Sequence, residues 1–405
     1  MINGEFIKVW SHYLSRLLSD RFYELILPLI VLGMSGSPIV TTAVLMVQKA
    51  ASILFAIPVG TFIERINVVT VAWVANFVYG CLLFFLSYIF ARDIGDLWLI
   101  TIIIFLLGFV GLVIQIAQQA MIPRIVSRER LLSANNLLEA ADAIVTFIGP
   151  ALGGYLFATY GGSTTLIICG TLYLAAMLLL IFTKYNHQPT VKKQQTLVKS
   201  VRAFIEESKA GMGHLFINAS QKLITLTAIV LSFSTTFIIL SVIIHADLTL
   251  AFSETQIGLL LSCAGIGNLL GVFLMLRFNQ MNWLPFLGLL MAISGVGIIL
   301  LTTSHFYLMC LGMVLFDGAL SMGFVVQISV QQGITPDHLI ARVRSAVYVL
   351  TSLTGMLATF LAGVITEWNT YLPFLIGTTI LSLLSLFLFK YRHNGVRLSE
   401  MRPLD

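Results

Sequence analysis

The chain has 405 residues, of which 58% are apolar and only 10% are charged, and its mean hydropathy is +0.96. A soluble domain carries roughly 25% charged residues, so this composition excludes a soluble globular protein, and the high apolar content excludes intrinsic disorder. The net charge is +5 at pH 7. We therefore expect a polytopic membrane protein and interpret the positive charge through its membrane topology.

Apolar runs long enough to span a bilayer, which takes about 20 residues, recur along the chain in two groups of six. The sequence therefore predicts an all-α polytopic membrane protein with 12 transmembrane helices in two pseudo-symmetric six-helix halves. The expected spans are 10–33, 38–63, 68–91, 97–120, 133–158, 163–183, 223–246, 255–276, 284–303, 306–330, 343–366 and 371–390.

Most of the 23 Lys and Arg residues fall on one face of this topology, whereas Arg92 falls on the other. Since cytoplasmic loops carry the excess of Lys and Arg, both termini are predicted to be cytoplasmic in a multi-pass protein of the cell membrane. The same bias accounts for the net charge without nucleic acid as a partner.

The long polar stretch between the two groups of spans is the natural boundary between the halves. Leu197, Val201 and Phe204 recur there at helical spacing, which predicts an amphipathic helix on the inner leaflet; a solvated linker is the alternative. The predicted organisation is an N-terminal half 1–183, a linker 184–222, a C-terminal half 223–392 and a cytoplasmic tail 393–405.

A short internal repeat supports duplicated halves. QQAMIP (Gln118 to Pro123) and QQGITP (Gln331 to Pro336) end corresponding spans, about half a chain apart, and each leads into a basic loop followed by a Ser-Ala pair.

No metal site or cofactor is expected. The cysteines lie far apart in apolar runs without CxxC or metal-ligand spacing, and we interpret them as small buried residues. The first apolar run is too long for a cleavable signal peptide. The cysteines are Cys81, Cys169, Cys263 and Cys310.

Twelve spans in two halves with a long cytoplasmic middle loop resemble the major facilitator superfamily. GTFIER, which contains Gly60, Glu64 and Arg65, resembles that superfamily's motif in the loop between spans two and three. The resemblance implies a gating role for these three residues.

GPALGG resembles the G-P-x-x-G-G motif of proton-coupled antiporters, in which Gly and Pro let helices approach closely and bend. The resemblance gives its residues a conformational role and indicates antiport, hence export; ordinary small-residue helix packing is the alternative. We assign Glu139, one turn closer to the cytoplasm than Asp142, to the inner gate. The motif residues concerned are Gly149, Pro150, Gly153 and Gly154.

MIPRIVSRERLLSANNLLEAADAIVTFIGPALGG is similar to the branch that contains macrolide-efflux and catecholate-siderophore (enterobactin-exporter-like) exporters, and SDRFYELILPLIVLGMSGSP resembles the first span of that branch. This resemblance implies export of a drug or siderophore by alternating access, a lipid-bilayer setting and a monomer. LLSANNLLEAADA also resembles lysophospholipid carriers, so a lipid flippase of the same fold is the alternative.

Ionisable residues inside apolar spans are candidate functional groups, because a charge at the bilayer centre costs at least ~2.5–3.5 kcal/mol. His12, Arg16, Asp20 and Glu24 recur every four residues and form one stripe along a helix, as expected of a cavity wall. Mutual neutralisation of the charges is the alternative.

We predict two groups of site residues. Glu24, Asp142 and Asp317 are the proton-coupling candidates, because a partly dehydrated carboxylate can exchange protons near working pH. The remaining candidates are predicted to bind a small-molecule substrate, and they are Asp20, Arg21, Lys49, Gln115 and Gln327.

The sequence contains no GxxxxGK[ST] motif, so the proton gradient rather than ATP is the expected energy source. HExxH and clustered catalytic groups are also absent, so an enzyme is not expected.

Overall fold

The structure is a computed structural model that describes residues 4–63, 67–92, 94, 96–126, 131–183, 206, 213, 215, 219–275, 277–278, 281–336, 339–394 and 397. Within these residues the regular structure is helical, with one isolated β-bridge between Asn282 and Arg397. The predicted all-α class is therefore confirmed. Helices satisfy every internal backbone hydrogen bond, which is what a chain needs inside a bilayer.

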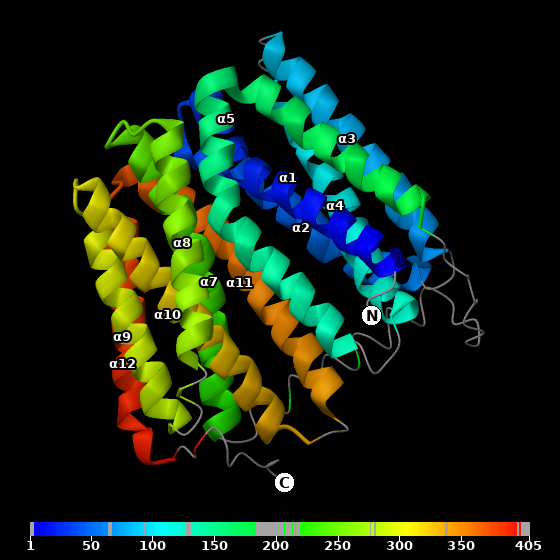
Figure 1. The fold of residues 1–405 in the computed structure, drawn as a ribbon. Helices are drawn as coiled ribbons and strands as arrows, with labels where there is room; N and C mark the ends of the chain where they lie inside the picture. The colour runs from blue at the N-terminus through cyan, green and yellow to red at the C-terminus, as the bar shows by residue number, and fades with distance from the viewer. Residues whose placement is uncertain are drawn as a thin grey trace. The chain divides into compact units, whose positions relative to one another are not determined.

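The helices follow one another along the chain as Figure 1 shows. They are α1 (Gly4–Ser35), α2 (Pro38–Ile63), α3 (Val68–Ala91), α4 (Leu97–Ile125), α5 (Leu131–Ile181), α7 (Ala219–Leu248), α8 (Glu254–Met275), α9 (Trp283–Leu301), α10 (Phe306–Ile334), α11 (Ile340–Trp368), α12 (Leu372–Lys390) and the short 3₁₀ helix η3 (Arg392–Asn394).

Among the described residues, 10 helices are long and apolar enough to cross a membrane. α1 is not one of them, because Asp20, Arg21 and Glu24 interrupt its apolar sequence. α5 counts once although it covers two of the expected spans. The result is compatible with the twelve predicted spans and confirms a multi-pass membrane protein.

Two glycines mark the breaks between consecutive helices of the first half. Gly161 lies inside α5 with φ 79° and ψ 167°, a backbone region that is essentially restricted to glycine. Gly36 has φ 63°, and its amide donates to the Leu32 carbonyl 2.8 Å away, which ends α1 before α2 begins. The chain therefore reverses at positions where side chains with a Cβ would be strained.

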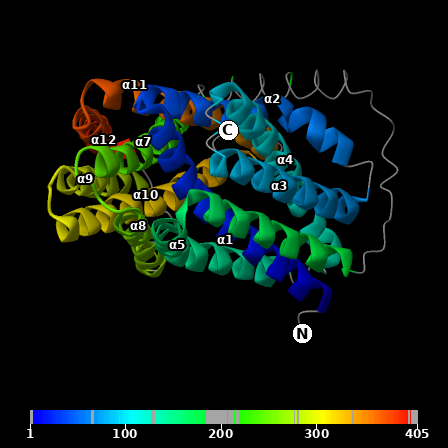
Figure 2. The same cartoon turned by 90° about the horizontal axis from the view of Figure 1, so that it is seen from above.

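The chain divides into two compact units. The first contains α1, α3, α4 and α5, with most of α2 and the first residues of α8. α1 lies along α5, as Figures 1 and 2 both show, and α3 packs against α4 and α5. Its core is apolar and draws on four helices, with Ile26 of α1, Leu83 of α3, Ile104 of α4 and Leu166 of α5 all fully buried.

The second unit contains α7 and α9–α12, with most of α8 and the first residues of α2. α9 packs against α10 and α12, and α7 packs against α10, α11 and α12. Close contacts use small residues: the Ser385 hydroxyl of α12 donates to the Gly288 carbonyl of α9 over 2.7 Å.

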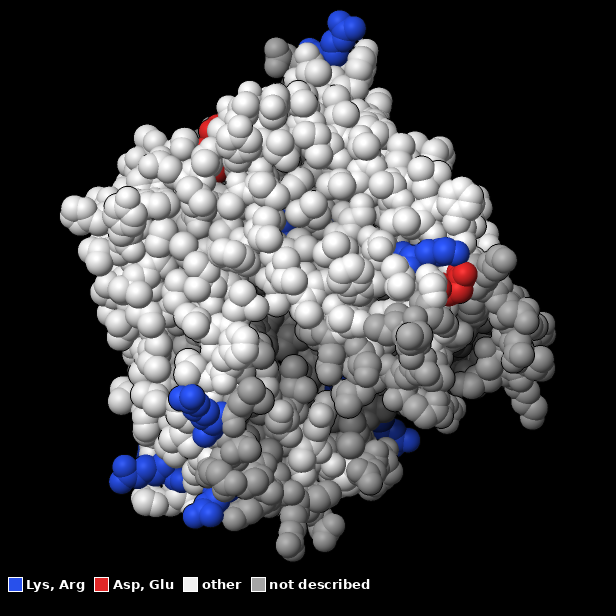
Figure 3. Space-filling model, viewed as in Figure 1, with Lys and Arg blue, Asp and Glu red and all other residues white. Residues whose placement is uncertain are grey.

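The outer surface of the described helices suits a lipid solvent. Large apolar side chains such as Phe182, Phe273 and Leu386 are more than half exposed, and the face drawn in Figure 3 is largely free of charged side chains. An aqueous surface would not leave so many apolar side chains uncovered.

The predicted linker 184–222 lies largely outside the described residues, so its amphipathic helix and the predicted domain boundaries stay predictions.

The break in α5 can be tested by stability measurements. Gly161→Ala is expected to lower the free energy of unfolding by about 1–3 kcal/mol, because the added Cβ is strained at this φ and ψ although no neighbouring atom lies within 4 Å of it. Thermal unfolding of the purified protein in detergent measures the change.

Gly33→Ala is the matched control. Gly33 lies within α1 and a Cβ there also meets nothing within 4 Å, so this substitution is expected to leave stability unchanged or raise it by up to about 1 kcal/mol. Equal effects of the two substitutions would show that Gly161 carries no special backbone requirement.

Candidate functional site

The charged residues of α1 form two adjacent clusters on this helix. The first, which we call the Asp20 cluster, consists of Arg16, Asp20 and Tyr173. Arg16 Nη1 lies 2.8 Å from Asp20 Oδ2, and the Tyr173 hydroxyl of α5 donates to the other carboxylate oxygen, Oδ1. The side chains of Arg16 and Asp20 are only 13% and 22% exposed. Asp20 is therefore held by two partners in a largely dry environment.

Aromatic rings close this cluster. Tyr79 of α3 stacks on Tyr173 with ring centroids 4.1 Å apart, and the Arg16 guanidinium lies 5.5 Å from the centroid of the Tyr13 ring. Such contacts fix the orientation of the hydroxyl and the guanidinium. The Asp20 cluster thus links α1, α3 and α5 through side-chain contacts.

The second cluster, which we call the Arg21 cluster, places one guanidinium between two carboxylates. Arg21 Nη1 lies 2.8 Å from Glu24 Oε2 on the same helix, and Nη2 lies 3.2 Å from Asp142 Oδ1 of α5. The Glu24 side chain is 59% exposed and the Asp142 side chain 38% exposed. Both carboxylates are therefore more exposed than that of Asp20.

Lys49 of α2 is the further cation of this region. It is half-buried and interacts electrostatically with Glu24, but it forms no ion pair within 4 Å of another described side chain. The close approach of α2 to α4 positions it, because Gly108 leaves room for the Gln48 backbone and accepts a 3.2 Å hydrogen bond from Ser52.

The GPALGG motif seats α5 against α1 beside the Arg21 cluster. An ideal Cβ on Gly149 would lie 2.7 Å from Arg21 Cβ, and one on Gly153 would lie 3.2 Å from Phe22 Cα. A Cβ on Gly154 would lie 3.1 Å from the Cα of Gly258, a residue at the start of α8 in the same unit. The glycines thus permit the close packing that brings Asp142 to Arg21.

Hydrogen bonds from α1 to carbonyls of α5 hold the two helices together beside these clusters. Ser15 donates to Leu172 over 2.9 Å and Ser19 to Cys169 over 3.1 Å. His12, which the sequence places on the stripe of a cavity wall, is fully buried, with Nδ1 3.2 Å from the Ala176 carbonyl. It belongs to this helix–helix contact.

The other predicted site residues are distributed over several helices. Gln115 is exposed on α4, Gln327 is buried on α10, and Asp317 is half-buried on α10. Gly60 lies near the end of α2, Pro150 is buried in α5, and the Glu139 side chain, Glu64 and Arg65 lie outside what the structure describes.

Sequence reasoning missed Tyr173, the hydroxyl partner of Asp20. A tyrosine within an apolar run gives no signal of its own, since most such rings pack against other helices. Its place opposite Asp20 follows from how α5 lies against α1.

A comparison with protein families identifies the fold. The profile of the Major Facilitator Superfamily matches residues 10–249, more than half of the chain. The chain belongs to this superfamily. Its members are transporters rather than enzymes, which confirms the expectation that the chain is not an enzyme. No curated protein sequence matches the chain.

Solved structures of transporters share the fold at low sequence identity. A bacterial homologue of the human lysosomal transporter Spinster matches with a TM-score of 0.76 at 13% identity, covering 98% of both chains. A bacterial homologue of the iron transporter ferroportin matches with a TM-score of 0.68 at 16% identity, covering 96% of this chain and 98% of that one. A point mutant of the nucleoside transporter NupG matches with a TM-score of 0.72 at 13% identity, covering 96% of this chain and 99% of that one.

The pairing within the Asp20 cluster can be tested by a double substitution. Asp20→Leu leaves the Arg16 guanidinium without its carboxylate and is expected to destabilise the protein by about 3–5 kcal/mol. Arg16→Met combined with Asp20→Leu is expected to recover most of that loss in thermal unfolding experiments. If the double variant is no more stable than Asp20→Leu alone, the ion pair is not what Asp20 contributes.

Proposed function

We propose that this superfamily member is a secondary-active exporter of the cell membrane. It moves a small polar or amphiphilic molecule, such as a macrolide or a siderophore, out of the cell by alternating access in exchange for protons. In this proposal the protein works as a monomer with both termini in the cytoplasm.

The single observation that carries the proposal is the sharing of Arg21 by two exposed carboxylates, those of Glu24 and Asp142. Arg21 is the ion-pair partner of both carboxylates and balances only one of their two negative charges, while Lys49, the other cation of the region, forms no ion pair with either within 4 Å. A proton or a cationic group of a substrate can therefore supply the second positive charge at the same place, which makes the two compete. Competition for one site is the requirement for antiport by alternating access.

Glu24 is the better proton carrier of the two carboxylates. Its side chain is 59% exposed against 38% for Asp142. Protonation of either carboxylate leaves Arg21 paired with the other, so the greater exposure is what favours Glu24. The carboxylate of Asp20 is less exposed and has two partners, Arg16 and Tyr173.

The substrate proposed here is an organic molecule rather than a metal ion. Within the described residues there is no group of three or more His, Cys, Asp or Glu side chains that could hold a metal. Lys49 and Arg21 offer cationic groups beside the carboxylates, which suits a polar molecule that carries both charged and hydrogen-bonding groups.

Transport into inverted membrane vesicles under an imposed pH gradient tests the proposal. Wild-type vesicles are expected to accumulate at least one compound from a panel of macrolides and catechol chelators. Glu24→Gln is expected to reduce gradient-driven accumulation by about tenfold or more, equivalent to at least 1.4 kcal/mol of lost coupling. The same variant should retain substrate counterflow, which needs no net proton movement.

Glu5→Gln is the matched control, because Glu5 is paired with Lys8 near the start of α1, away from the Arg21 cluster. It is expected to transport like the wild type. Asp142→Asn and Asp317→Asn, measured in the same assay, show how much each of these carboxylates contributes to gradient-driven accumulation. Wild-type accumulation that ignores the gradient would rule out proton antiport and favour the lipid-flippase alternative.

A further inference from the structure

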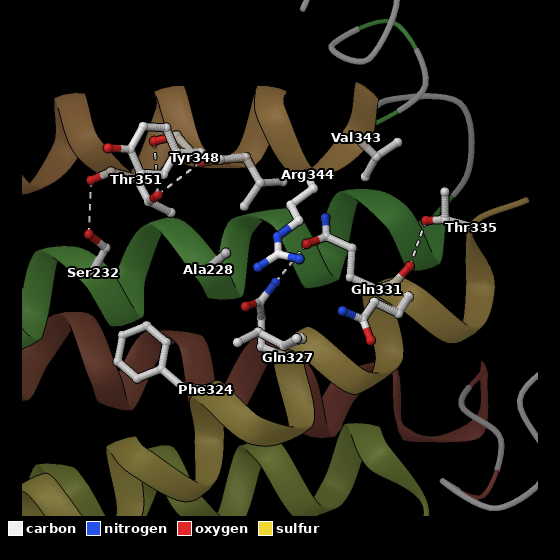
Figure 4. A pocket seen from close by; sticks show the side chains of 13 residues that line it. Ala228, Ser232, Phe324, Gln327, Gln331, Thr335, Val343, Arg344, Tyr348 and Thr351 are labelled. Carbon is white, nitrogen blue, oxygen red and sulfur yellow. Dashed lines mark hydrogen bonds between the residues drawn. The ribbon is translucent and has the colours of Figure 1, made fainter. Parts of the chain in front are cut away.

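A cavity of about 290 Å³ lies within the second unit, between α7, α10 and α11. Figure 4 shows its side chains: Ser232 comes from α7, Phe324, Gln327 and Gln331 from α10, and Arg344 and Tyr348 from α11. Ligand pockets typically enclose roughly 300–1,000 Å³, so this cavity accommodates a small molecule or one end of a larger one.

Two buried amides form the floor of this α7–α10–α11 pocket. Gln327 Nε2 donates to Gln331 Oε1 over 2.9 Å, and the two residues are only 3% and 8% exposed. Gln331 Nε2 is buried and finds no hydrogen-bond partner among the described residues. A buried donor without an acceptor is unfavourable, so an acceptor brought by a ligand would be stabilised here.

Arg344 supplies the charge of the pocket. Its side chain extends from α11 toward Gln327 and Gln331 in Figure 4, and it forms no ion pair or hydrogen bond with another described residue. The described residues that line the pocket include no Asp or Glu. A guanidinium without a counter-ion in this part of the chain, beside an amide without an acceptor, matches a carboxylate or a phosphate group.

Much of the remaining wall of the pocket is apolar, although Ser232, Thr335 and Thr351 also line it. Phe324, Val347 and the ring of Tyr348 line it. An ion alone would leave this surface uncovered, whereas an apolar body attached to the anionic group would fill it.

We propose that the α7–α10–α11 pocket binds an anionic group, a carboxylate or a phosphate, carried on an apolar body. Arg344 pairs with the anion, Gln331 donates a hydrogen bond to it, and Phe324 and Tyr348 cover its apolar part. This inference rests on the proposed export function only where it takes the bound molecule to be the transported substrate. Binding itself requires no proton gradient.

Equilibrium binding to the full-length protein in phosphatidylcholine nanodiscs tests the pocket. The probes are 4-butylbenzoate, the neutral 4-butylbenzamide and the cationic 4-butylbenzylamine, which differ chiefly in charge. Calorimetry is expected to show the benzoate binding at least about tenfold more tightly than the other two, since tenfold corresponds to 1.4 kcal/mol. Benzoate binding that is absent, or matched by the amine, would overturn the proposal.

Substitutions assign the binding to Arg344. Arg344→Gln is expected to weaken benzoate binding about tenfold, to leave benzamide binding unchanged, and to be partly rescued in Arg344→Lys. Arg342→Gln is the matched control, because Arg342 is exposed like Arg344 and lies two residues away on the same helix, but it does not line the pocket. Equal weakening by Arg342→Gln and Arg344→Gln would mean a general surface attraction and would overturn the proposal.

A competition experiment distinguishes a lipid from an aqueous ligand. Lysophosphatidate that displaces the benzoate from the wild type would identify a lipid headgroup as the anion, and failure to displace it would identify a water-soluble anion. Glu5→Gln, a carboxylate substitution away from the pocket and from the Arg21 cluster, should bind the benzoate like the wild type. If the protein binds the benzoate but shows no gradient-driven transport, the export proposal fails and the binding proposal stands.

Discussion

The cost of placing ionised side chains on an apolar helix determines how α1 is built into the protein. Each charge near its middle has a partner: Arg16 and Tyr173 hold Asp20, and Arg21 bridges Glu24 and Asp142. Because two of these partnerships reach α5, the charges fix α1 against that helix in addition to apolar packing. The same pairing explains why exposure differs so much along one helix. Asp20 is enclosed between two partners, whereas the side chain of Glu24 is more than half exposed.

Close helix packing is the second condition for this arrangement, and the glycines of GPALGG meet it. Asp142 lies two turns before Gly149 on α5, and it reaches Arg21 only because Gly149 and Gly153 let α5 approach the α1 backbone. A motif that the sequence links to antiporters therefore has a concrete local effect here: it sets the distance between the helices that carry the Arg21 cluster. The structure shows the small-residue packing of GPALGG, while a conformational role in transport stays a prediction.

Much of the fold could be predicted from the sequence, because span length and charge bias are dictated by the bilayer. The Arg21–Glu24 pair could also be predicted, since residues three apart share a helix face. The partner of Asp20 could not, because Tyr173 reaches it through the packing of α5 on α1. His12 shows the opposite failure: its spacing from Asp20 predicts the exposed wall of a cavity, but His12 is fully buried in the α1–α5 contact, next to the Ala176 carbonyl. Periodicity gives the face of a helix and does not say what covers it.

Arg344 shows the same limit in the second unit. In the sequence it is one of two arginines near the start of a span, and the positive-inside rule accounts for both. The structure separates them, because Arg344 lines a cavity with buried amides and Arg342 does not. The two units thus differ in how their charged side chains are paired. In the first, carboxylates and guanidinium groups satisfy one another and leave Glu24 as the exposed member. In the second, the Arg344 guanidinium and the Gln331 amide nitrogen are left without protein partners among the described residues.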